Sequence, residues 1–230
     1  MSPLRNRLCG ALALLATSTL CAAADLPADS IYQLGAQLTT QTGNTTGMDL
    51  YRGHPTLISM FYGSCPAACP MLISAMQAYE SHLDKRSRAR LRVLLVSFDA
   101  ARDTPQQLDR LARLHHTDPA RWTFASAAEP EARRIAVSLG FSYRRLPGGE
   151  FEHSLLITLL DSSGRIIAST TKLVGDAQFQ ARLQSATQPA EHAVARSPAA
   201  AGAAPTLPSA QDRDSSLPSH PPTNRSPADG

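Results

Sequence analysis

The chain has 230 residues and a mass of 24.6 kDa, and its 43% hydrophobic and 18% charged side chains are typical of a soluble globular protein with a packed core. The formal net charge of +3 approaches neutrality once two arginines of a predicted leader are set aside, which argues against a nucleic-acid-binding surface. No apolar stretch beyond the leader is long enough to span a bilayer, and no repeat or cysteine density indicates collagen, a coiled coil or a disulfide scaffold.

The N-terminal residues have the order of a secretory signal. Arg5 and Arg7 precede a short apolar run, and three alanines separate that run from Asp25. This order predicts a signal peptide over residues 1–24 and export to the periplasm. An uncleaved segment would instead anchor the chain, and only in that case do we expect contact with a membrane.

Hydrophobic spacing and turn residues predict a single α/β domain over residues 25–185, with a central sheet flanked by helices. In chain order we first expect an N-terminal hairpin within 31–52, a buried strand at 56–62, a helix at 71–83 and a central parallel strand at 91–98. Next come a helix that Thr104 caps and Pro105 begins, a strand at 122–124, and a helix at 129–139 that Gly140 ends. The domain closes with a hairpin of 154–160 with 165–170 and a helix from Asp176 to Leu183.

The C-terminal residues differ in composition from this domain. Residues 186–230 are rich in Pro, Ala and Ser and contain no aromatic side chain. Such a segment buries too little apolar surface to offset the entropy lost on ordering. We therefore predict a disordered tail over 186–230.

The cysteines of the mature chain, Cys65 and Cys69, lie where the first buried strand gives way to a helix. Residues four apart share one helical face with side-chain bases about 5–6 Å apart, which suits either a disulfide or two sulfurs on one metal ion. The positive end of the helix is expected to lower the thiol pKa and favour the thiolate. In an exported protein the pair is therefore either a disulfide or a site kept reduced for a purpose.

Counting ligands narrows the choice of metal. A structural zinc site needs four ligands, and haem attachment or a thioredoxin-type redox pair has two residues between its cysteines, whereas three intervene here. Two soft thiolates with one imidazole suit copper, and His153, just before the strand at 154–160, is the best placed histidine. Taken alone, His153 is more often a hydrogen-bonding residue than a ligand. His115 and His116 are interpreted as surface residues of a helix.

Three ordered stretches resemble the Sco/SenC family of thioredoxin-like copper proteins: residues 61–70 around the cysteines, residues 96–105 with Asp99, Arg102, Asp103 and Thr104, and Glu152-His153-Ser154 followed by 161–164. The resemblance implies a thioredoxin-like fold and copper, as Cu(I) or Cu(II), held by Cys65, Cys69 and His153. It also implies copper delivery to, or redox preparation of, the binuclear copper site of cytochrome c oxidase.

The partner that the resemblance implies is the copper-bearing oxidase subunit or another periplasmic copper or thiol protein. We expect Asp99 to contact the metal ligands without binding the metal itself. We expect Asp103 with Thr104 to form a helix cap with a local ion pair. Two alternatives stay open: a periplasmic thiol-disulfide reductase that uses Cys65 and Cys69 as its redox-active pair, and a binding module in which the pair is an inert disulfide.

Overall fold

The computed structural model describes residues 25–65 and 68–189. Within them a seven-stranded sheet has the order β2-β1-β5-β4-β3-β8-β9. The strands are β1 (Gln37–Thr40), β2 (Thr45–Gly47), β3 (Thr56–Phe61), β4 (Arg92–Ser97), β5 (Trp122–Ala127), β8 (Ile157–Leu160) and β9 (Ile166–Thr170).

The centre of the sheet is parallel and fully covered. β3 pairs with β4 and β4 with β5 in parallel, whereas β1 and β8 join the two sides in antiparallel orientation. Every residue of β3 is buried, as its unbroken apolar run predicts for a strand covered on both faces. Because β3 and β4 run the same way, the loops that follow them meet at one edge of the sheet.

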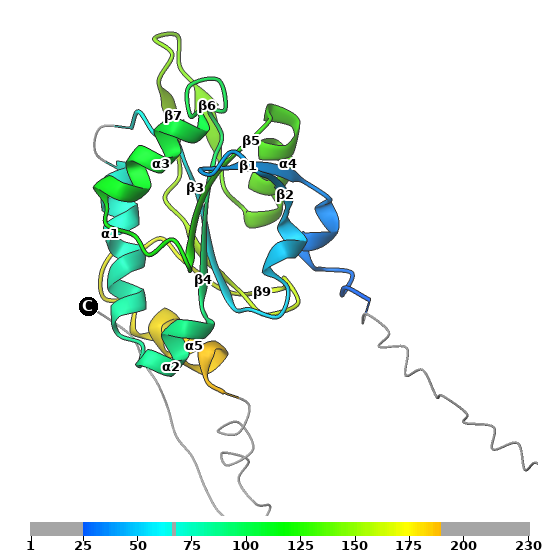
Figure 1. Cartoon of the computed structure of the whole chain (residues 1–230), viewed down its shortest axis with the longest axis vertical. Helices are drawn as coiled ribbons and strands as arrows, with labels where there is room; N and C mark the ends of the chain where they lie inside the picture. Colours follow the sequence, from blue (N-terminus) through cyan, green and yellow to red (C-terminus); the bar gives the residue numbers. More distant parts are fainter. Residues whose placement is uncertain (1–24, 66–67, 190–230) are drawn as a thin grey trace, which may run out of the picture. The chain divides into compact units, whose positions relative to one another are not determined.

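The helices cover the two faces unequally (Figure 1). α1 (Ala68–Ser81) and α3 (Pro105–Leu114) connect successive parallel strands, and right-handed crossovers in one direction place both on the same face. α5 (Ala177–Thr187) packs beside α1, where the rings of Tyr79 and Phe179 lie 5.0 Å apart. α4 (Glu129–Leu139) covers the other face together with the short helix η1 (Ile31–Leu34). The arrangement is thioredoxin-like, as predicted.

Local capping signals determine where several helices begin and end. The hydroxyl of Thr104 accepts from the backbone N–H of Gln107 at the start of α3. The carboxylate of Asp176 accepts from the N–H of Phe179 at the start of α5. Gly140 ends α4 at a φ of 71°, a conformation that side chains disfavour. These caps and both predicted hairpins are confirmed.

The structure differs from the sequence prediction between residues 143 and 157. β6 (Tyr143–Arg145) and β7 (Phe151–His153) form a separate two-stranded ribbon, which we did not predict. The strand expected from residue 154 begins only at Ile157. Ser154 still belongs to the ribbon, because its N–H donates to the carbonyl of Ser142.

The last helix also runs further than predicted. α5 continues to Thr187, whose side chain is buried and donates its hydroxyl proton to the carbonyl of Leu183. The ordered domain therefore extends past residue 185. The predicted signal peptide and all but the first few residues of the predicted tail lie outside the described residues. Among the residues that are described, no helix is long and apolar enough to cross a membrane.

Two further short helices complete the described chain. η2 (Met48–Tyr51) precedes β3, and α2 (Lys85–Arg90) joins α1 to β4. Asp84 caps α2 by accepting from the N–H groups of Arg86 and Ser87.

Candidate metal centre

Three side chains converge at the carboxyl edge of the parallel strands. The sulfurs of Cys65 and Cys69 and a ring nitrogen of His153 all lie within 4.8 Å of one another. The Cys65 sulfur is 4.0 Å from Nε2 of His153. Cys65 follows β3, Cys69 lies in the first turn of α1, and His153 ends β7. The fold thus brings together the three residues that the sequence singled out.

The loop that carries Cys65 is tied to the end of β4 by a buried carboxylate. Asp103 accepts from the N–H of Gly63 at 2.7 Å and from the hydroxyl of Ser97. A side chain at position 63 would collide with that carboxylate, so glycine is required there. Burial is the main cause that raises the pKa of Asp103. The expected cap with a local ion pair is therefore right for Thr104 and wrong for Asp103, which is a buried tie between two strands.

The two cysteines occupy different environments. Cys65 is 9% exposed, Cys69 is 3% exposed, and both are present as thiols. The N–H of Cys69 donates to the sulfur of Cys65 at 3.4 Å, so Cys65 accepts a hydrogen bond at the start of α1.

Burial dominates the ionisation of the second thiol. The pKa of Cys69 is raised, chiefly because burial disfavours the charged form. This corrects the expectation that the helix start would lower it, since at Cys69 desolvation exceeds the effect of the helix dipole. A metal ion bound there must displace the proton of Cys69, which makes binding dependent on pH.

His153 is oriented by its neighbours. Its Nδ1 lies 2.8 Å from the carbonyl of Ser154, and because a carbonyl only accepts, the proton is assigned to Nδ1. Nε2 then presents its lone pair toward the cysteines. The rings of Tyr62, Phe98 and Phe141 lie 5.6, 5.8 and 6.0 Å from the imidazole and hold it in an apolar setting.

The β6–β7 ribbon that carries His153 is attached to the loop after β4. Phe98 stacks on Tyr143 with ring centroids 4.4 Å apart and meets the edge of Phe151. Beside this stack, Arg145 lies 3.4 Å from the carboxylate of Asp99, which is buried and also pairs with Arg102. Asp99 thus contacts the arginine of β6 that helps to hold the ribbon. Its supporting role toward the ligands remains a prediction.

Sequence reasoning missed this aromatic ribbon, although a signal was present. Leu146 donates its N–H to the carbonyl of Glu150, and Gly149 takes a φ of 85°, which closes a hairpin. A Pro-Gly-Gly turn between two segments with aromatic and charged residues is typical of such a hairpin. The short length of each strand concealed it.

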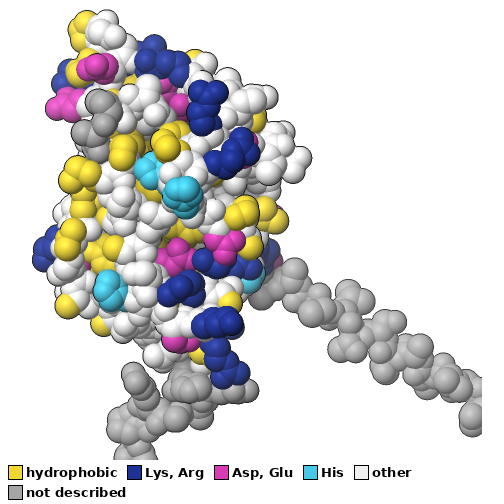
Figure 2. Space-filling model, turned by 60° about the vertical axis from the view of Figure 1, so that its left-hand side comes forward, with side chains coloured by type: hydrophobic (Ala, Val, Ile, Leu, Met, Phe, Trp, Pro, Cys, Tyr) yellow, Lys and Arg dark blue, Asp and Glu magenta, His cyan; other side chains and the backbone are white. Residues whose placement is uncertain are grey.

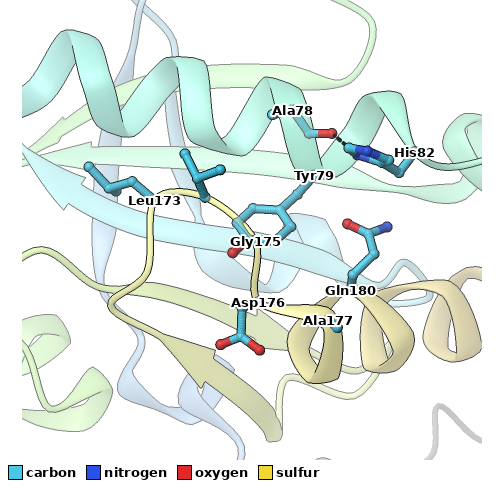
Figure 3. Close-up of a pocket in the computed structure, with 9 residues that line it drawn as sticks. Ala78, Tyr79, His82, Leu173, Gly175, Asp176, Ala177 and Gln180 are labelled. Atoms are coloured by element: carbon cyan, nitrogen blue, oxygen red, sulfur yellow. Dashed lines mark hydrogen bonds between the residues drawn. The ribbon is translucent and has the colours of Figure 1, made fainter.

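Other candidate features lie away from the three ligands. α3 ends at Leu114, so His115 follows the helix and His116, with a φ of 50°, leaves it. A hollow of about 260 Å³ lies between α1 and the segment before α5 (Figure 3). Tyr79, Leu173 and Val174 make it largely apolar, and it holds none of the three ligands.

Sequence comparison finds relatives of this chain among known proteins. A sequence profile described as SCO1/SenC matches residues 31–188. A Stutzerimonas stutzeri protein whose name assigns it copper binding is 31% identical over 72 residues, which cover 31% of this chain and 35% of that protein. An SCO2-like protein of Rickettsia typhi is 23% identical over 137 residues, or 57% of this chain and 66% of that protein. The chain thus spans less than two thirds of either curated relative.

Solved structures share the fold. ScoI of Bradyrhizobium japonicum, with copper bound, aligns with a TM-score of 0.53 and 24% identity over 66% of this chain and 96% of that one. BsSco, described as a member of the Sco family of cytochrome c oxidase assembly proteins, aligns with a TM-score of 0.54 and 19% identity over 66% and 90%. At these identities the likeness establishes the fold alone.

Proposed function

Because the chain belongs to the SCO1/SenC family, we propose that it binds one copper ion through Cys65, Cys69 and His153 and serves the assembly of the copper centre of cytochrome c oxidase. The observation that carries this proposal is the convergence of two sulfurs and one imidazole nitrogen within 4.8 Å. The copper-bound relative and the described role of BsSco support the choice of cargo and of client.

The donor set suits copper chemically. Atoms that bond one ion at about 2–2.3 Å lie about 3–4.5 Å apart, and the 4.0 Å between the Cys65 sulfur and Nε2 of His153 falls in this range. Soft thiolates favour Cu(I), and the imidazole adds a donor that Cu(II) also accepts. Because Nδ1 carries the proton that is donated to the carbonyl of Ser154, Nε2 keeps the lone pair that would bind the copper ion.

The environment suits a cargo that is later released. His153 belongs to a short ribbon outside the main sheet, and Cys65 is the more exposed of the two cysteines. A partner that supplies its own ligands can take the ion stepwise, with His153 and Cys65 leaving before the buried Cys69. We also propose that the chain is exported, which the arginines and apolar run of residues 1–24 support.

A second candidate activity is reduction of a partner's disulfide, which the unequal burial of the cysteines favours. The Cys65 thiolate would attack the partner's disulfide, form an intermolecular disulfide and expel one partner thiolate, which takes up a proton. Cys69 would then attack the Cys65 sulfur, close the Cys65–Cys69 disulfide and release the second partner thiol. The partner gains the two electrons that the pair loses, and His153 is not required.

Anaerobic copper titration of the reduced full chain separates the two activities. We expect one Cu(I) per chain, with affinity that falls when His153 is replaced by Ala and is lost when either cysteine is replaced by Ser. His82→Ala serves as the control, because the Nδ1 of His82 donates to the carbonyl of Ala78 near the end of α1, away from the cysteines. Absence of copper binding, together with rapid disulfide exchange, would favour the reductase.

A further inference from the structure

The segment around α2 concentrates positive charge. Five of the eight residues from 85 to 92 are basic: Lys85, Arg86, Arg88, Arg90 and Arg92. We call these five the α2 basic patch. The acidic neighbour Asp84 is already engaged, since its carboxylate accepts from the N–H groups of Arg86 and Ser87 and from the Ser87 hydroxyl.

The α2 basic patch differs from most of the described surface in its ion pairing. Among the described residues, none of its five cations lies within salt-bridge distance of a carboxylate, whereas eight arginines elsewhere do: Arg102, Arg113, Arg121, Arg133, Arg134, Arg144, Arg145 and Arg165. Charge is therefore neutralised locally over much of the domain and left uncompensated here. Figure 2 shows several Lys and Arg side chains toward the lower end of the domain and others toward its upper end.

The side chains of the patch have two arrangements. Lys85, Arg86 and Arg90 are exposed. Arg88 and Arg92 are half-buried and donate to main-chain carbonyls, Arg88 to Ser81 and Leu83 at the end of α1. The half-buried pair has a structural role, and the three exposed cations are available to a ligand.

The patch lies at the opposite end of the sheet from the metal centre. It precedes the amino end of β4, whereas Cys65 follows the carboxyl end of β3, and the two strands are parallel. Six residues of β4 span about 20 Å. Figure 1 shows α2 and the β6–β7 ribbon at opposite ends of the domain.

We propose that the α2 basic patch binds the surface of an anionic phospholipid bilayer. Charge complementarity carries the choice, because clustered Lys and Arg side chains bind acidic headgroups without needing a shaped pocket. The buried centre of a protein interface is depleted in charged residues and more apolar than its rim, but the large exposed hydrophobic residues of the described chain all lie outside 81–92. A chain bound in this way turns Cys65, Cys69 and His153 away from the bilayer.

Vesicle binding of the full chain tests the proposal. Vesicles of phosphatidylcholine alone are compared with vesicles that also contain phosphatidylglycerol, at low and at high salt. We expect preferential binding to the anionic vesicles that weakens with salt. Replacement of Lys85, Arg86 and Arg90 by Gln should lower this affinity about a hundredfold, at about fivefold for each cation.

The matched control is the triple variant Arg110→Gln, Arg113→Gln and Arg133→Gln, which changes the net charge equally at exposed positions of α3 and α4. It should retain most of the anionic-vesicle affinity. An equal loss in both triple variants, or an unchanged affinity in the patch variant, would overturn the proposal. Tighter binding to a soluble polyglutamate than to the vesicles would also overturn it, in favour of an acidic protein partner.

Two measurements keep the test independent of other effects. If the patch triple variant has a lower Tm than the unaltered chain, the single variants Lys85→Gln and Arg86→Gln test the proposal instead. Each should lower the affinity for anionic vesicles about fivefold. Copper titration of the patch variant should match that of the unaltered chain. The membrane proposal does not rest on copper binding. A chain that binds vesicles but not copper, or copper but not vesicles, therefore contradicts one of the two proposals and leaves the other standing.

Discussion

The proposed metal centre brings together two regions that are built in different ways. The loop that carries Cys65 is tied into the core by the buried Asp103, and α1 follows it directly. The ribbon that carries His153 lies outside the main sheet. It is held by stacked rings and by the ion pair between its own exposed Arg145 and the buried Asp99. The comparison indicates that the thiols are fixed by the fold itself, whereas the imidazole is docked onto it.

The largest expected effect separates the two kinds of ligand. Replacement of Cys69 by Ser should lower Cu(I) affinity by much more than the tenfold to hundredfold typical of groups behind a ligand, because a soft thiolate in the rigid region is lost. His153→Ala should lower the Cu(I) affinity by less than Cys69→Ser does, since imidazole is a weaker donor than thiolate for Cu(I). Competition with a chromogenic Cu(I) chelator measures both. Equal losses would contradict the distinction between the regions.

The next effect concerns stability. Asp103→Ala should lower the free energy of unfolding by about 2–4 kcal/mol, because the Gly63 N–H and the Ser97 hydroxyl both lose a buried acceptor. Arg145→Ala, in the docked ribbon, should cost less than about 1 kcal/mol, because its partner Asp99 keeps Arg102. Urea unfolding at neutral pH gives both values. A larger loss for Arg145→Ala would mean that the ribbon belongs to the cooperative core.

A third prediction tests whether Asp99 acts through the ribbon. Asp99→Asn should weaken copper binding by about tenfold, because Arg145 loses the charged partner that positions β6. The loss should nearly vanish when His153 is already Ala and should persist when Glu152 is replaced by Gln. Copper competition on the single and double variants gives the coupling energy. Simple additivity with His153→Ala would exclude a positioning role.

The smallest effect is the pH dependence of stability. The pKa of Asp103 is raised by burial above its ordinary 3.8, so the stability it contributes is complete below that value and is lost as the pH rises through the folded-state pKa. The pKa of Asp176, which caps α5, is lowered by the N–H of Phe179, so its contribution is present above 3.8 and is lost as the pH falls.

Unfolding curves across this pH range, with Asp103→Asn and Asp176→Asn as the paired variants, should show slopes of opposite sign relative to the unaltered chain. The same sign for both would show that burial does not control Asp103.

Features that depend on neighbouring residues were predictable. The buried run of β3, the Thr104 cap and the Gly140 stop are confirmed in the structure. Its position at a strand end made His153 the best placed histidine, but taken alone a hydrogen-bonding role was the commoner interpretation, and the family resemblance favoured the ligand role.

Features that depend on distant contacts were not predictable in the same way. The ribbon of β6 and β7 is short, and the aromatic cluster that stabilises it includes Tyr62 and Phe98, some 40 to 90 residues earlier in the chain. Asp103 resembled a helix-cap neighbour in the sequence, and its bond to Gly63 depends on a strand end 40 residues away.

The amino-acid sequence by itself determined the alternation of strands and helices, the caps of α3, α4 and α5, and the pair of sulfurs at a helix start. These features follow from hydrophobic period and from hydrogen bonds within a few residues. Only the tertiary structure decided that Nε2 of His153 faces the Cys65 sulfur, that the pKa of Cys69 is raised and that the α2 basic patch lies opposite the metal centre. Burial and through-space distance control these properties, and both arise only when segments distant in the chain pack together.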